Sequence, residues 1–214
     1  MAVTQPQKLT IVGCGPGSPD HLTEAGRRAI ARAGLLVGAP HLLDLYATPA
    51  HERISVGSDI SYVLNAIATR LEQVRTVVLV SGDPGLCSLA GPVLRRFGRD
   101  SCEVIPGVSS VQLAFARLGL DWLDARIVSA HKGVPDLTPA DLERSGSIAV
   151  LAGHRKSQSW IADMAEAFGD KRILVLCQDL SLPDESIRRV SAAEFRRLDV
   201  SNRTIVLLLK EDAF

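Results

Sequence analysis

The chain has 214 residues, of which 46% are hydrophobic, 22% charged and 4% aromatic, and its formal net charge is zero. This length suffices for one large domain or two small ones with a sizeable core. Neutrality and scarce aromatic side chains argue against nucleic acid as the main partner, and no apolar run approaches the roughly 18 residues of a membrane span.

The first half of the chain alternates predicted strands and helices. Short apolar runs predict strands at residues 9–12, 35–37, 77–80 and 103–105. Apolar spacing typical of helices predicts helices at residues 23–33, 61–72, 89–97 and 111–118, the first of them capped by Thr23. This alternation implies a parallel sheet with helices on both of its faces.

The second half restarts after a break at residues 119–122. Apolar runs predict strands at residues 126–128, 148–151, 173–177 and 204–209. Residues 186–190 follow a turn at Pro183 and suggest antiparallel pairing, and Ser191 with Glu194 forms a capping box that should begin a short helix. We therefore predict two α/β domains, residues 1–119 with a parallel sheet and residues 120–214 with a mixed sheet.

Two glycine-proline turns directly follow predicted strands. Residues 13–17 read Gly-Cys-Gly-Pro-Gly, and residues 81–85 read Ser-Gly-Asp-Pro-Gly. Glycines at the carboxyl edge of a sheet let the backbone approach a ligand closely. Prolines remove amide donors, which is unusual for a turn that binds phosphate. The pair of turns therefore predicts a small-molecule site that does not use the common phosphate chemistry.

The first turn taken alone leaves several interpretations open. A dinucleotide fingerprint is disfavoured, because Ser18 stands at its third glycine and Gly38 where a ribose-binding acid is expected. A P-loop would need a lysine, which this turn lacks. The S-adenosylmethionine turn of the doubly wound methyltransferases carries an acid where this chain has Ile11. A tight turn without any ligand also fits this motif.

Three ordered motifs together resemble the tetrapyrrole methylase family. Residues 12–23 are similar to the opening signature of that family, residues 81–84 to its central loop, and residues 106–110, Pro-Gly-Val-Ser-Ser, to its third. The resemblance extends over residues 9–209. It implies two α/β domains with a ligand cleft between them.

The second half resembles one branch of this family, the precorrin C-5 methyltransferases of cobalamin biosynthesis. Residues 117–122, residues 128–131 and the stretch Leu-Ser-Leu-Pro-Asp-Glu-Ser-Ile at residues 180–187 carry this likeness. Two departures affect how a substrate carboxylate would be held. Lys132 and Gly133 stand where Gly-Arg is usual, and Ser186 replaces a usual arginine.

The resemblance implies S-adenosylmethionine as the cofactor and a corrinoid tetrapyrrole as the substrate. Asp83 would face the cationic sulfonium or the amino group. The cofactor-binding residues that the motifs imply are Pro16, Ser81, Gly82, Asp83, Leu86, Ser109, Ser110, Ala152 and Leu180.

The implied reaction is methyl transfer to C-5 of a precorrin or a cobalt-precorrin. A carbon of this kind needs no strong base before attack, but a residue that removes the proton afterwards would help. His131 is the candidate for this role, and a structural or carboxylate-binding histidine is the alternative. Arg117, Lys132 and Arg155 are expected to pair with the carboxylates of the substrate.

Location and assembly are expected from weaker signals. The four cysteines have neither disulfide nor zinc spacing, which favours reduced thiols, no metal site and a cytoplasmic protein. The resemblance implies a homodimer, and it leaves methylation at C-15 with decarboxylation to a separate subunit. The alternatives are a methyltransferase for another tetrapyrrole position, a non-catalytic S-adenosylmethionine-binding module and, outside this family, a nucleotide-dependent oxidoreductase. The presence of cobalt in the substrate stays open.

Overall fold

The computed structural model describes residues 8–131, 133–153 and 155–211, which form two compact units. The first unit ends at Ser109 and the second begins at Ser110. This division precedes the expected boundary at residues 119 and 120. The difference is helix α5 (Ser110–Leu118), which packs against strand β10 (Thr204–Lys210) and so lies in the second unit.

The first unit is built on one parallel sheet. Its five strands lie in the order β3-β2-β4-β1-β5, and every neighbouring pair is parallel, which confirms the prediction. The elements in chain order are β1 (Leu9–Gly13), η1 (Pro19–His21), α1 (Glu24–Ala31), β2 (Leu35–Gly38), α2 (Pro40–Tyr46), β3 (Glu52–Ser55), α3 (Ile60–Ala68), β4 (Thr76–Val80), α4 (Ala90–Phe97) and β5 (Cys102–Ile105).

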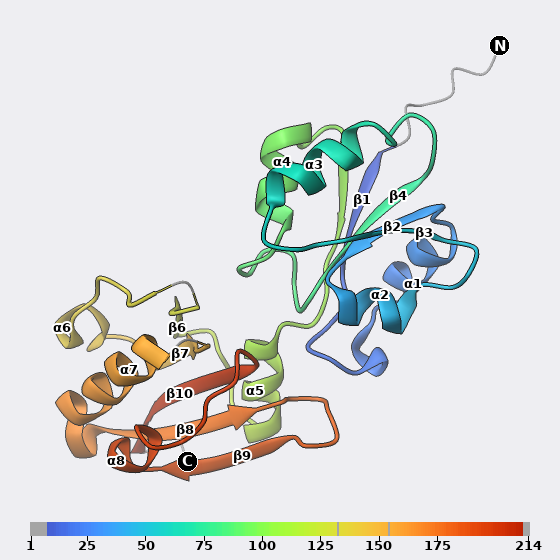
Figure 1. Cartoon of the computed structure of the whole chain (residues 1–214). Coiled ribbons are helices and arrows are strands. Elements are labelled where there is room, and N and C mark those ends of the chain that lie inside the picture. The colour runs from blue at the N-terminus through green and yellow to red at the C-terminus, as the bar shows by residue number, and fades with distance from the viewer. Residues whose placement is uncertain (1–7, 132, 154, 212–214) are drawn as a thin grey trace. The chain divides into compact units, whose positions relative to one another are not determined.

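Side chains of each central strand alternate between two apolar layers. Leu9 and Ile11 of β1 pack in the layer beneath α3 and α4, whereas Val12 packs in the layer beneath α1 and α2 (Figure 1). A strand that is covered on both faces reads as a continuous apolar run, which is why β1 and β4 were predictable. Thr23 caps α1 as predicted, since its hydroxyl accepts from the Gly26 amide at 3.1 Å.

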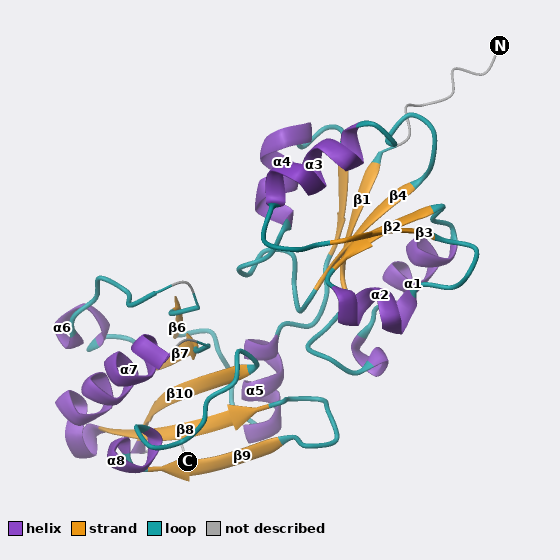
Figure 2. Cartoon of the chain, viewed as in Figure 1, coloured by secondary structure: helices purple, strands orange, loops and turns teal. Residues whose placement is uncertain are grey.

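The second unit has the predicted mixed sheet, in the order β6-β7-β10-β8-β9 (Figure 2). Strands β6 and β7 pair in parallel, and the remaining pairs are antiparallel. Besides α5 and β10, its elements are β6 (Ala125–Ser129), α6 (Pro139–Leu142), β7 (Ser147–Leu151), α7 (Arg155–Phe168), η2 (Gly169–Lys171), β8 (Arg172–Gln178), β9 (Ser186–Val190) and α8 (Ala192–Phe195).

Helices cover both faces of the second sheet as well. Val206 and Leu208 of β10 pack in the apolar layer shared with α6, α7 and α8. Leu209, which points to the other face, lines a small hollow together with Phe115 of α5. Ser191 begins α8 as predicted, because its hydroxyl accepts from the Glu194 amide at 3.1 Å. Among the residues described, no helix is long and apolar enough to cross a membrane.

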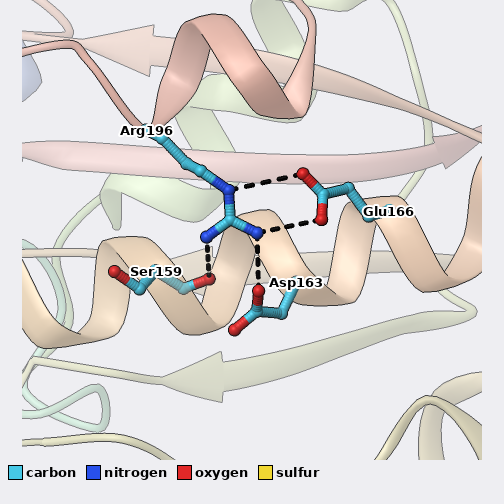
Figure 3. A network of polar contacts seen from close by, with 4 residues as sticks. All are labelled: Ser159, Asp163, Glu166 and Arg196. Carbon is cyan, nitrogen blue, oxygen red and sulfur yellow. Dashed lines mark hydrogen bonds and ion pairs between the residues drawn. The ribbon is translucent and has the colours of Figure 1, made fainter.

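One arginine connects α8 to α7 (Figure 3). Arg196, directly after α8, donates to the Asp163 carboxylate at 2.5 Å, to the Glu166 carboxylate at 2.9 and 3.3 Å, and to the Ser159 carbonyl at 3.4 Å. Both acidic side chains are more than half exposed. Exposed pairs of this kind typically contribute up to about 1 kcal/mol each.

Candidate functional site

Three glycine-containing turns meet at one edge of the first sheet. They follow β1, β4 and β5, which are neighbours in the sheet and run in the same direction, so their carboxyl ends lie together. Gly15 of the first turn and Gly82 of the second form an antiparallel bridge. The Gly82 amide donates to the Gly15 carbonyl at 2.7 Å, and the Gly15 amide donates to the Gly82 carbonyl at 3.3 Å.

Glycine is required where these turns touch. A Cβ atom on Gly13 would lie 2.6 Å from the Gly107 amide nitrogen and 2.7 Å from the Gly82 carbonyl oxygen. A Cβ atom on Gly107 would lie 2.5 Å from the same oxygen. Gly82 itself has a φ of 65°, a conformation that favours glycine. The three backbones therefore pack at distances that leave no room for side chains.

The Asp83 carboxylate joins the second turn to the third. Its Oδ1 accepts from the Gly85 amide at 2.7 Å, and its Oδ2 accepts from the Gly107 amide at 3.2 Å. Within the described part of the chain, no lysine, arginine or histidine forms an ion pair with Asp83. Among the described residues, the carboxylate at the junction of the turns is therefore held by backbone amides and not by a cationic side chain.

This arrangement selects the kind of ligand that the turns can take. The amides of Gly15, Gly82, Gly85 and Gly107 all donate within the chain, and a proline at residue 16, 84 or 106 has no amide hydrogen to offer. A phosphate site needs inward amides and positive potential, whereas this edge presents a carboxylate. The geometry therefore suits a ligand with a cationic group.

The other residues of the first unit that are expected to bind the cofactor lie in or next to these turns in the sequence, and they differ in exposure. Ser81 is exposed, Pro16 and Leu86 are half-buried, and Ser109 is buried. His41 of α2, for which the sequence predicts no role, places its Nε2 atom 3.3 Å from the Ser81 hydroxyl oxygen. No local sequence pattern predicts this contact, because helix α2 was not predicted and the two residues are distant in the sequence.

Cys14 lies inside the first turn but has no nucleophilic role. It is buried, and its thiol donates to the Val12 carbonyl at a sulfur–oxygen distance of 3.6 Å. Burial raises the pKa of this thiol to about 12. The thiol is therefore protonated at neutral pH and too weakly ionised to attack a substrate.

In the second unit, His131 and Ala152 lie together at the carboxyl ends of β6 and β7. The His131 Nδ1 atom is 2.8 Å from the Ala152 carbonyl oxygen. Because a carbonyl only accepts, Nδ1 carries the hydrogen in this contact, and the neutral ring keeps its lone pair on Nε2. A Cβ atom on Gly153 would lie 2.7 Å from Nδ1, so glycine is what allows the ring to approach. The amide of Ala152 also has a partner, the Thr204 carbonyl at 3.0 Å.

Leu180 is buried in the loop between β8 and β9. The Ser181 amide donates to Oε2 of Glu185 at 2.6 Å. Arg117 of α5, expected to meet substrate carboxylates, donates to both carboxylate oxygens of Glu185, at 2.6 and 3.2 Å. This hydrogen bonding raises the pKa of the Arg117 guanidinium above its usual value. Arg117 therefore already has a carboxylate partner within the chain.

The remaining predicted residues are less informative. Ser110 is the first residue of α5 and Arg155 the first of α7, where its side chain is exposed. Lys132 lies outside the described residues. Among the residues that the structure describes, no hydrogen bond joins Arg155 to His131, and the roles expected for both stay predictions.

Replacing Asp83 with asparagine tests whether its carboxylate joins the turns. An asparagine side chain has a single acceptor oxygen, so either the Gly85 or the Gly107 amide would face an NH₂ group. We expect a loss of about 1–3 kcal/mol, the cost of an unsatisfied donor at a partly buried position. Thermal unfolding of Asp83→Asn against Asp100→Asn, a matched change at an exposed position, measures it. Equal midpoints for the two variants would contradict the role given to Asp83.

Comparison with known proteins places the chain in a family. The model of the tetrapyrrole (corrin/porphyrin) methylases matches residues 8–196, and the chain belongs to this family. It is 31% identical over 180 residues to the cobalt-precorrin-7 C(5)-methyltransferase of Salmonella typhimurium, covering 84% of this chain and 88% of that protein.

Solved structures agree with this assignment. The precorrin-6Y methylase of cobalamin biosynthesis from Archaeoglobus fulgidus superimposes with a TM-score of 0.74 at 25% identity, over 96% of this chain and 99% of that one. The uroporphyrin-III C-methyltransferase of Thermus thermophilus, solved with S-adenosylhomocysteine, has the same fold, with a TM-score of 0.74 at 21% identity over 94% and 92% of the two chains. The two-domain α/β fold expected from the motifs is thereby confirmed.

Proposed function

We propose that this chain is an S-adenosylmethionine-dependent methyltransferase that methylates C-5 of a precorrin or cobalt-precorrin in cobalamin biosynthesis. Membership of the tetrapyrrole methylases, the C(5)-methyltransferase of Salmonella typhimurium and the precorrin-6Y methylase of Archaeoglobus fulgidus support this reaction. The observation that carries it is the Asp83 carboxylate at the junction of three glycine turns, where the amides are already used.

S-adenosylmethionine fits the chemistry of these turns. It carries a sulfonium and an ammonium group but no phosphate, which agrees with a carboxylate in place of free amides. When bound, it supplies a methyl group activated by its sulfonium leaving group. We assign the first-unit contacts to Pro16, Ser81, Gly82, Asp83, Leu86 and Ser109, and those of the second unit to Ser110, Ala152 and Leu180.

The chain's own residues would align the reactants, exclude water and accept a proton. The glycine turns let the backbone approach the donor closely, and alignment alone contributes up to about 7–11 kcal/mol in favourable cases. The Nε2 atom of His131, free of the Ala152 contact, would accept the proton that leaves C-5. Arg155 and Lys132 would pair with substrate carboxylates, a role for which Arg117 would first have to leave Glu185.

Location and assembly complete the proposal. We place the enzyme in the cytoplasm, in agreement with the reduced state expected for its four cysteines. Family resemblance supports a homodimer, and it supports a separate subunit for C-15 methylation and decarboxylation. Size-exclusion chromatography with light scattering measures the first of these, and a single-chain mass would contradict it.

One experiment tests the reaction directly. The protein is incubated with methyl-labelled S-adenosylmethionine and purified precorrin intermediates, with and without cobalt, and the labelled carbon is located by NMR. We expect the label at C-5. A label at another carbon would select a sibling activity. Binding of S-adenosylhomocysteine without labelling of any corrinoid would indicate a non-catalytic binding module.

A further inference from the structure

The loop between β8 and β9 holds an unfavourable backbone conformation on both sides of Leu180. Asp179 has a φ of 48° and Ser181 a φ of 71°, and neither is a glycine. Elsewhere in the described residues, only Cys87 among non-glycine residues has a positive φ. Side chains with a Cβ atom persist in this region only where surrounding contacts hold them, and such positions cluster at ligand sites.

Two sets of contacts hold this loop. On one side, the Asp179 amide donates to the Arg203 carbonyl at 3.3 Å, and the two side chains lie 3.7 Å apart. On the other side, the Ser181 amide donates to Glu185 at 2.6 Å, and Glu185 is held in turn by both donors of the Arg117 fork. The Glu185 side chain is 23% exposed, so its charge depends on this partner more than a fully solvated carboxylate would.

Helix α5 connects a second residue assigned to methyl-donor binding, Ser110, with the contacts that hold this loop. It begins at Ser110 and carries Arg117 in its last turn, and it packs on β10, the neighbour of β8. A short helix is a rigid spacer. Through Arg117 and Glu185, it therefore connects Ser110 with the loop that presents Leu180, although these residues are far apart in the sequence.

We propose that Arg117 and Glu185 are positioning residues that hold the Leu180 loop in the conformation that binds the methyl donor. This rests on the proposed function, since Leu180 and Ser110 are donor contacts only there. The ion pair fixes the loop conformation before the substrate binds. It therefore affects the affinity for S-adenosylmethionine and not the reaction rate at saturating substrate. Arg117 thereby has a role in donor binding instead of the substrate contact expected for it.

The test compares donor affinity and steady-state kinetics of Arg117→Ala, Glu185→Gln and the double variant in the full chain. Calorimetry with S-adenosylhomocysteine should show binding about tenfold weaker in each single variant, which corresponds to about 1.4 kcal/mol. The KM for S-adenosylmethionine should rise by a similar factor while kcat changes little. The double variant should be no weaker than the worse single variant, because both remove the same contact. Arg117→Lys, which keeps the charge but not the fork, should recover part of the affinity.

Arg196→Ala is the matched control, since it removes an ion-pair network of the same unit that contacts no assigned donor residue. It should leave the affinity for S-adenosylhomocysteine unchanged. Wild-type affinity in all Arg117 and Glu185 variants, or an equal loss in Arg196→Ala, would overturn the positioning role. Failure of the wild-type chain to bind S-adenosylhomocysteine would instead overturn the proposed function itself.

Discussion

The variant Gly13→Ala should melt about 6–12 °C below the wild-type chain and lose measurable binding of S-adenosylhomocysteine. The new methyl carbon would lie 2.6–2.7 Å from atoms of Gly107, Gly82 and Pro84, two of which belong to the backbone. Backbone atoms cannot rotate away as a flexible side chain can, so the turns would have to separate. Overpacking of this kind costs about 1–3 kcal/mol and sometimes more, and we expect the upper end here.

Gly57→Ala is the control for this change. A Cβ atom on Gly57 would meet nothing within 4 Å, and its backbone is outside the left-handed region. The same substitution there should leave stability unchanged or raise it by about 0.4–1 kcal/mol, because alanine restricts the unfolded chain. Equal midpoints for Gly13→Ala and Gly57→Ala would show that the turns are not packed as described.

Loss of Arg172 should destabilise the second unit by about 3 kcal/mol or more. This arginine is 7% exposed, and its guanidinium donates to the carbonyls of Ser145 at 2.6 Å and of Gly146 and Leu208 at 3.2 Å. Weaker contacts reach the Leu142 and Glu143 carbonyls, and the group lies 5.0 Å from the centre of the Phe168 ring. Burial lowers the pKa of Arg172, but an arginine stays charged at neutral pH.

Arg172→Leu would remove the guanidinium from these carbonyls, of which that of Leu142 has a further donor, the Ser145 amide at 3.1 Å, and thermal unfolding measures the cost. Lys171→Ala, at the next position, is the comparison, because that lysine is 77% exposed and pairs only with an exposed glutamate. We expect its midpoint to stay close to that of the wild-type chain. If the two variants unfolded at the same temperature, the hydrogen bonds of the Arg172 guanidinium would not stabilise the second unit.

Apolar patterning predicted the strands of the sheets well, with one exception. Nine strands were placed to within one residue at each end. Six of these are largely buried and read as short apolar runs, whereas β5, β6 and β9 are only partly buried. The exception, β3, is an edge strand in which Ile54 is the lone apolar residue, so only its pairing with β2 makes it a strand. Such information is not local to the sequence.

Helix α7 shows why a buried helix can escape prediction. Its covered face includes Ser157 and Gln158 as well as small alanines, which dilute the apolar periodicity. Gln158 is tolerated there because its amide donates to the carbonyls of Phe195 and Leu198, at 2.5 and 2.8 Å. These partners come from α8 and the segment after it, so nothing within residues 155–168 reveals why a polar side chain belongs in the core.

The candidate site also contains one part that the sequence predicts and one part that it does not. The glycine turns were predictable, because backbones that approach closely require glycine, and glycines are visible in the sequence. The partner of Arg117 was not, since any of the 24 acidic residues could have met it and Glu185 is remote in the sequence. Sequence patterns therefore identified the glycine turns but not the ion pair beside the Leu180 loop.

The position of β10 has a consequence for the order in which the protein forms during synthesis. All strands of the first sheet have been made once residue 105 is reached, so every strand of this sheet then has its neighbours. The second sheet lacks its middle until residue 210, because β10 separates β7 from β8. We expect the first unit to fold on the growing chain. Until β10 is made, β8 and β9 should remain exposed and unpaired with β6 and β7.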